Sequence, residues 1–178
     1  GNVNGIDSYR GYGPDWMDDL SRWLGPEFAG EYPEQYLRPQ YLPKLPIFHL
    51  VGGLDKLTRA ELDDSDPDDG LPNCLADWIA YEGVYCLKVK LRGADLDWDI
   101  DRTIAVHDIG REELDRVGIE PLYLTADTNE MCASPEYIVE MLRRLRERSP
   151  ECYERLLYIE QPTGRDLDVD GHDMRAIA

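Results

Sequence analysis

The feature that most constrains the fold is a regular alternation of predicted strands and helices from residue 54 onward. Strands are expected over residues 54–62, 84–91, 121–127 and 155–160. Helices are expected over 73–82 and 97–117, after Ser134, and from Asp173 onward. The connections between successive strands are too long for hairpins, so the strands must run parallel. The pattern therefore predicts an α/β fold.

Residues 1–46 show no such alternation. Glycine, asparagine and tyrosine dominate the first 13 residues, and a short helix is expected over 14–24. Tyrosines then alternate with prolines up to residue 45, which is typical of an extended connector. We therefore predict two parts: an irregular N-terminal segment over 1–46, a remnant of or connector from a capping domain, and an α/β domain over 47–178.

Charge and composition exclude several classes of partner. The 178-residue chain has a net charge of −18 and a pI near 4.4, so nucleic acid and anionic membranes are not expected to bind it. No apolar run approaches the roughly 18 residues of a membrane span, and no secretory signal opens the chain. The four cysteines form no CxxC pair and are interpreted as reduced thiols. A cytoplasmic protein is predicted. The excess of Asp, and of Arg over Lys, also fits the hypothesis of a protein kept soluble in high salt.

Two of the four lysines lie together in the segment Leu87-Lys88-Val89-Lys90-Leu91. Apolar and cationic residues alternate there with the period of a strand, so both ammonium groups project to the same face. On a solvated edge strand they would guard against unwanted pairing. On a buried strand they would need a chemical role.

Polar residues are expected at the C-terminal ends of three successive strands: Lys88 and Lys90, then Asp127, then Glu160. In parallel α/β sheets and barrels this end holds ligands and catalytic groups. Two carboxylates can hold Mg²⁺, and a nearby lysine can act as a base if its pKa is lowered. Taken alone, each carboxylate is more often a cap for the next helix and each lysine more often a solvated side chain, but together they favour a site.

These strand ends resemble a known family. Lys88-Val-Lys90, Asp127-Thr-Asn129 and Ile159-Glu-Gln-Pro162 are similar to successive strand-end motifs of the enolase superfamily, in the branch of mandelate racemase and muconate-lactonising enzyme. The stretch Leu45-Pro-Ile-Phe-His-Leu-Val-Gly-Gly53 is similar to the segment that leads into the barrel there. The resemblance covers roughly residues 45–178.

The resemblance implies a TIM-type (β/α) barrel, of which residues 47–178 would form about the first four βα units. It also implies a Mg²⁺ cofactor and a small carboxylate substrate, whose α-proton is removed to give an enediolate. Asp127 and Glu160 would be metal ligands, and Lys90 would be the general acid/base. Lys88 would lower the pKa of Lys90, and Asn129 would face the substrate. Racemisation, epimerisation, cycloisomerisation and acid-sugar dehydration share this step.

The chain also departs from the family. The family's third metal ligand, on the fifth strand, and its second acid/base group have no position here, and a full barrel takes about 250 residues. We therefore expect this chain to be inactive alone. The open edge of a four-stranded sheet is expected to pair in a homo-oligomer or with a missing second barrel half.

The alternative function is a non-catalytic acidic α/β module that binds calcium. Asp166-Leu-Asp168-Val-Asp170-Gly171 imitates the start of a calcium loop. Its twelfth position is Ile177, which cannot supply the carboxylate, so a solvated acidic loop is favoured. The pairs His107-Asp108 and His172-Asp173 are expected to have surface or capping roles.

Overall fold

The computed structural model describes residues 2–166 and residue 171. The chain divides into two units, residues 1–45 and residues 46–178. The helix expected from Asp173, the His172-Asp173 pair and most of the loop between Asp166 and Gly171 lie outside the described residues. Within the described part, no helix combines the length and the apolar character needed to cross a bilayer.

The first unit consists of turns and one short helix, α1 (Ser21–Leu24). The prediction of a helix over 14–24 was therefore wrong in extent. The carboxylate of Asp19 accepts hydrogen bonds from the Ser21 amide (3.1 Å) and the Gly30 amide (2.7 Å), so a new turn begins there. Four single 3₁₀ turns make up the rest of its regular structure: η1 (Asn2–Asn4), η2 (Ser8–Arg10), η3 (Pro26–Phe28) and η4 (Pro33–Tyr36).

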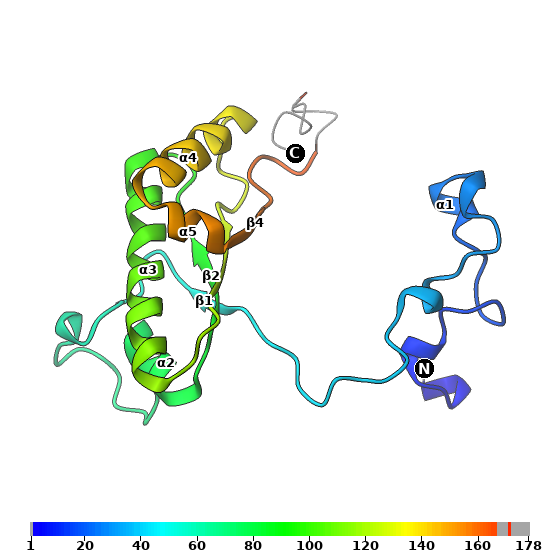
Figure 1. Ribbon diagram of the computed structural model, residues 1–178, viewed down its shortest axis with the longest axis horizontal. Helices are drawn as coiled ribbons and strands as arrows, with labels where there is room; N and C mark the ends of the chain where they lie inside the picture. The colour runs from blue at the N-terminus through cyan, green and yellow to red at the C-terminus, as the bar shows by residue number, and fades with distance from the viewer. Residues whose placement is uncertain (1, 167–170, 172–178) are drawn as a thin grey trace. The chain divides into compact units, whose positions relative to one another are not determined.

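The second unit confirms the predicted α/β class, with a sheet of four parallel strands in the order β1-β2-β3-β4 (Figure 1). The strands are β1 (His49–Val51), β2 (Cys86–Lys90), β3 (Tyr123–Asp127) and β4 (Leu156–Glu160). The helices are α2 (Leu75–Glu82), α3 (Leu96–Val117), α4 (Pro135–Arg148) and α5 (Pro150–Arg155), with one 3₁₀ turn, η5 (Arg59–Glu61).

The first strand is not where the sequence placed it. The strand expected over 54–62 is wrong, because β1 lies earlier, within the apolar run that ends at Val51. Residues 59–61 instead form the turn η5. The Glu61 carboxylate closes that turn by accepting hydrogen bonds from the backbone amides of Leu57 (3.2 Å) and Thr58 (2.8 Å).

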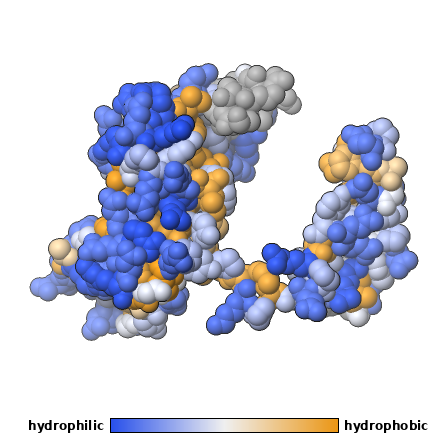
Figure 2. Space-filling model, viewed as in Figure 1, coloured by the Kyte–Doolittle hydropathy of each residue, from blue (hydrophilic) through white to orange (hydrophobic). Residues whose placement is uncertain are grey.

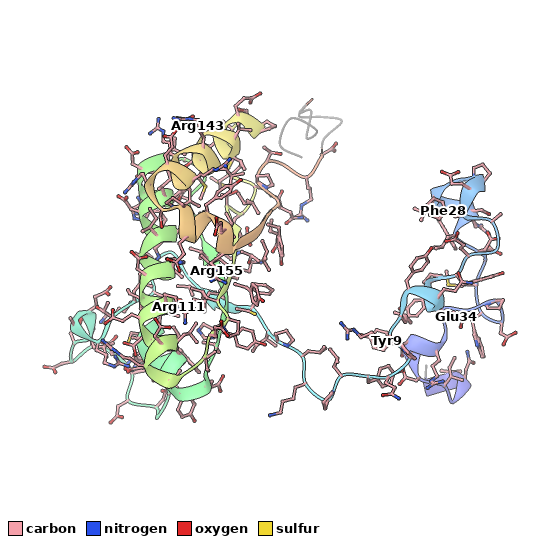
Figure 3. The ribbon with its side chains drawn as sticks, in the orientation of Figure 1. Tyr9, Phe28, Glu34, Arg111, Arg143 and Arg155 are labelled. Carbon is pink, nitrogen blue, oxygen red and sulfur yellow. The ribbon has the colours of Figure 1, made fainter. Side chains whose placement is uncertain are left out.

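The helices α2 to α5 lie along one face of the sheet (Figure 1). Alternate residues of the central strands are fully buried in the core, which contains Leu87, Val89, Leu124 and Ala126. Helix α3 contributes Ile100, Val106 and Leu114, also fully buried. The solvent side of the helix layer is charged; Arg143 on α4, for example, pairs with Glu140 and Glu147 (Figure 3).

His107 contradicts the expected surface role, because it is only 3% exposed. It lies one turn after the buried Thr103 and two turns before the buried Leu114 of α3, so helical spacing places it on the inner face. Its Nδ1 lies 2.8 Å from Oδ1 of Asp108, and its Nε2 has no partner among the described residues.

Candidate functional site

The register of the sheet brings the polar strand ends together. Lys90 on β2 pairs with Asp127 on β3, which in turn pairs with Glu160 on β4. Lys88 lies two residues before Lys90, so its side chain projects to the same face, opposite the helices. Parallel strands end at one edge of the sheet, and this shared edge gathers the four side chains.

Lys88 stands between the two carboxylates. Its Nζ lies 2.6 Å from Oε2 of Glu160 and 3.0 Å from Oδ2 of Asp127. Lys90 also forms an ion pair with Oδ2 of Asp127, and it donates a hydrogen bond of 2.7 Å to Oδ1 of Asn129. The Asn129 amide in turn donates to Oδ1 of Asp127 at 2.8 Å. All five residues predicted for the site therefore belong to one network.

Burial differs across this network. The Asp127 side chain is 7% exposed, whereas those of Lys88 and Lys90 are 22% and 24% exposed. Burial acts to raise the pKa of Asp127, but hydrogen bonds from Lys90, the Asn129 amide and Lys88 outweigh it and hold that pKa below its ordinary value. The hydrogen bond to Glu160 raises the pKa of Lys88 most, and the hydrogen bond to Asp127 raises it further. Lys88 is thus a fixed positive charge at neutral pH.

The loop after β2 is held by a buried carboxylate that the sequence did not single out. Asp99 is fully buried at the start of α3. Its carboxylate accepts hydrogen bonds from the backbone amides of Arg92 (2.7 Å) and Gly93 (2.9 Å) and from the hydroxyl of Tyr137 (2.7 Å). This carboxylate ties the loop that follows Lys90 to helices α3 and α4. The sequence signal was weak, because Asp99 is one of four alternating aspartates.

The loops after β3 and β4 are joined by backbone hydrogen bonds. The Glu130 amide donates to the Gln161 carbonyl and the Cys132 amide to the Pro162 carbonyl, each at 3.0 Å. Asn129, Glu130 and Gln161 all have positive φ, at 53°, 65° and 39°. Non-glycine residues adopt this conformation at an energetic cost, and such strain clusters at functional sites.

Gly93 provides a test of how tightly the loops after β2 and β3 pack. Its φ is +69°, and an added Cβ would lie 2.9 Å from the Met131 Cβ and 3.1 Å from the Cys132 amide nitrogen. We expect Gly93→Ala to cost about 2–4 kcal/mol, because left-handed strain and overpacking add. Gly118→Ala is the control: φ is +74° there, but nothing lies within 4 Å of the added Cβ.

Urea denaturation followed by circular dichroism measures both variants. Gly118→Ala carries the conformational strain alone and is expected to cost about 1 kcal/mol. Equal costs at the two positions would contradict the close contact at Gly93.

The carboxylates of this network can be tested as ligands for a Mg²⁺ ion. In the part of the chain that the structure describes, no three His, Cys, Asp or Glu side chains gather as a metal site. Asp127 and Glu160 nevertheless direct one oxygen each at a single cation, the Lys88 ammonium. Mg²⁺ is commonly held by one or two carboxylates, with water and substrate oxygens completing its shell. The donor pair therefore fits this ion.

Comparisons with models of known protein families, with curated proteins and with solved structures found no match to this chain. The functional inference is therefore carried by the chemistry of the strand-end network.

Proposed function

We propose that this chain is part of a Mg²⁺-dependent enzyme of the enolase type, which removes the proton α to a substrate carboxylate through an enediolate. We further propose that its four parallel strands belong to a TIM-type barrel. The observation that supports both proposals is the convergence of two lysines and two carboxylates at the C-terminal edge of the sheet. That edge is where parallel α/β folds place their catalytic groups.

The family resemblance suggests a role for each residue, and the contacts of the strand-end network support these roles. Asp127 and Glu160 would hold Mg²⁺, which when bound supplies positive charge beside the substrate carboxylate. Lys90 would move the proton once its ion pair with the Asp127 carboxylate has opened. Lys88, which already stands between the two carboxylates, would retain its charge and help to neutralise the enolate. The Asn129 amide would contact the substrate.

A titration with Mg²⁺ tests the proposal. Isothermal calorimetry would compare the wild type with Asp127→Asn, Glu160→Gln and, as a control on the exposed surface, Asp101→Asn. We expect the first two changes to weaken Mg²⁺ binding at least tenfold, because each removes one of two charged ligands. Circular dichroism would verify that every variant is folded.

The calcium alternative is separated by Asp170→Asn and by a parallel titration with Ca²⁺. If the enzyme proposal is right, this change leaves Mg²⁺ binding as in the wild type. If only Asp170→Asn weakens cation binding, the enzyme proposal fails and the chain is an acidic calcium-binding module.

A further inference from the structure

We propose that Thr128 is a positioning residue for the strand-end network. Its hydroxyl fixes the distance between the Asp127 and Glu160 carboxylates, so that one cation can contact both. The functional meaning of this role rests on the proposed Mg²⁺ site, but the role itself can be measured without metal. A residue of this kind acts through its neighbours and touches neither substrate nor metal.

The two carboxylates come from strands whose pairing is irregular. Leu156 of β4 pairs with Leu124 of β3, but Tyr158 of β4 pairs with Thr125, the very next residue of β3. This shift interrupts the regular ladder between the beginnings of the two strands and their ends, where the carboxylates lie. A hydrogen bond beyond the strand ends therefore adds to what the pairing alone can fix.

A buried hydroxyl joins the two segments just beyond these ends. Thr128 follows Asp127 directly and is fully buried. Its Oγ1 donates a hydrogen bond of 3.1 Å to the carbonyl of Pro162, which lies two residues after Glu160. Proline has no amide hydrogen, so this carbonyl is the only backbone group through which Pro162 can be held by a hydrogen bond. The hydroxyl thus links the loop after one carboxylate to the loop after the other.

The direction of this hydrogen bond follows from its partners. A carbonyl only accepts, so the Thr128 hydroxyl must donate to Pro162. The hydroxyl oxygen in turn lies 3.4 Å from Sγ of Cys132. Burial raises the pKa of that thiol, which is therefore protonated at neutral pH and can donate. The Pro162 carbonyl also accepts from the Cys132 amide at 3.0 Å, so the three residues form one closed set of hydrogen bonds.

The backbone beside each carboxylate has an unfavourable conformation. Gln161, which follows Glu160, has a φ of 39°, and Asn129, two residues after Asp127, has a φ of 53°. Non-glycine residues keep such a conformation only where surrounding contacts fix it. The Thr128 hydroxyl supplies one of these contacts, because it bonds the residue that follows Gln161. Loss of this bond would let the backbone relax and carry the neighbouring carboxylate out of its ion pair.

The separation of the carboxylates decides whether one cation can contact both. The Lys88 Nζ does so, at 2.6 Å from Glu160 and 3.0 Å from Asp127. Mg²⁺ requires shorter contacts, of about 2.1 Å, in a regular geometry, so it tolerates less displacement than an ammonium group. Substitution of residues that orient metal ligands typically weakens metal binding by about 10- to 100-fold.

Three substitutions isolate the hydroxyl. Thr128→Val replaces it with a methyl group of similar size and removes the bond to Pro162, whereas Thr128→Ser keeps a hydroxyl. Thr125→Val is the matched control, because Thr125 is also fully buried and lies on β3 two residues before Asp127. Its Oγ1 has no hydrogen-bond partner among the described residues. Circular dichroism and urea denaturation would establish that each variant is folded.

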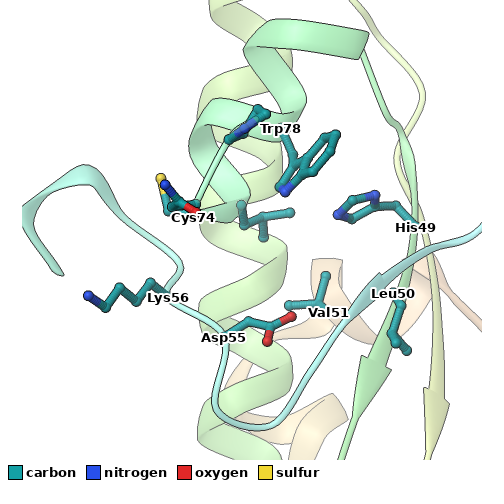
Figure 4. Close-up of a pocket in the computed structure, with 10 residues that line it drawn as sticks. His49, Leu50, Val51, Asp55, Lys56, Cys74 and Trp78 are labelled. Carbon is teal, nitrogen blue, oxygen red and sulfur yellow. The ribbon is translucent and has the colours of Figure 1, made fainter. Parts of the chain in front are cut away.

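The readout without metal is the NMR spectrum of the lysine side chains, of which the chain has only four. Thr128→Val should speed the exchange of the Lys88 ammonium hydrogens with water, because the Glu160 carboxylate no longer holds this group. Thr128→Ser and Thr125→Val should leave that exchange as in the wild type. Lys56 is the internal reference in every variant. It lines the cavity beside β1 (Figure 4) and pairs with two carboxylates of its own, so its exchange should not change.

Calorimetric titration with Mg²⁺ is the second readout. Thr128→Val should weaken binding about tenfold, whereas Thr128→Ser and Thr125→Val should bind as the wild type does. Hydrophilic residues dominate the surface over α3 and α4 in Figure 2, and the net charge of the chain is −18, so surface carboxylates also attract the ion. The titrations are therefore run at about 0.15 M KCl, which screens the exposed charges.

The two readouts separate the positioning role from the proposed function. Faster exchange at Lys88 in Thr128→Val, in a chain that binds no Mg²⁺, would support the role of Thr128 and refute the Mg²⁺ site. Unchanged exchange at Lys88 in a folded Thr128→Val chain would overturn the positioning role. An unchanged Mg²⁺ affinity of this variant would do the same where the wild type binds the ion.

The control variants can also overturn the role. An equal effect of Thr128→Ser would mean that the hydroxyl is not the active group, and an equal effect of Thr125→Val would mean that any change in this strand disturbs the site. If Thr128→Val does not fold, Thr128→Ala takes its place. Failure of both to fold would show that the hydroxyl is needed for the fold itself, which contradicts a positioning role.

Discussion

Replacement of Asp99 by alanine is expected to lower the free energy of unfolding by about 3–5 kcal/mol. The Asp99 carboxylate is fully buried and accepts hydrogen bonds from two backbone amides and from the Tyr137 hydroxyl. The substitution leaves these donors buried without an acceptor, and each unsatisfied donor costs about 1–3 kcal/mol. Water that enters the space of the lost carboxylate can accept hydrogen bonds from some of these donors, which reduces the total cost.

Two variants locate the origin of this loss. Tyr137→Phe removes one donor and keeps the two amide contacts, so we expect a cost of about 1–2 kcal/mol. Asp95→Ala is the control, since the Asp95 carboxylate caps α3 at the exposed Trp98 amide and is expected to cost about 1 kcal/mol. Urea denaturation gives all three values. An Asp99→Ala variant within 1 kcal/mol of the wild type would contradict the assigned role.

Replacement of Asp127 by leucine is expected to cost about 2–3 kcal/mol at neutral pH. Removing one partner of a buried ion pair usually costs 3–5 kcal/mol, and the partial exposure of Lys88 and Lys90 reduces this because both ammonium groups can reach water. The exposed pair of Asp101 with Arg148 is the control, and Asp101→Leu should change stability by less than about 1 kcal/mol.

The pH dependence of the Asp127→Leu effect follows from two shifted pKa values. The pKa of Asp127 is lowered by folding, so its contribution is present above the unfolded value of about 3.9 and is lost as pH falls through the folded pKa. The pKa of Lys88 is raised, so its contribution is full below about 10.4 and is lost as pH rises through the folded pKa. The difference from wild type should therefore be constant between about pH 5 and 10. A difference that persists unchanged at pH 2 would contradict an electrostatic origin.

The sequence predicted the site best where two features act together. These are the two-residue period of side chains along a strand and the parallel direction of the strands. Alternation in β2 placed Lys88 and Lys90 on one face, and the parallel order placed Asp127 and Glu160 at the same edge. Both follow from local geometry, so no tertiary contact had to be known. The roles of these residues in catalysis stay predictions.

Elements that depend on tertiary contacts were missed. β1 has three residues, too few to show a period, and only its pairing with β2 defines it. Helix α5 was not expected, because its six residues follow α4 with Pro150 at its first turn. The contact between Asp99 and Tyr137 spans 38 residues of sequence, and nothing local marks it.

The hydrogen bonds between the loops after β3 and β4 have a mechanical consequence. The Glu130 and Cys132 amides are bonded to the carbonyls of Gln161 and Pro162, so neither loop can be displaced while the other remains in place. Asn129 and Glu160 belong to these two segments. A rearrangement that admits a ligand must therefore move Asn129 and Glu160 together, or first break the two backbone hydrogen bonds between the loops.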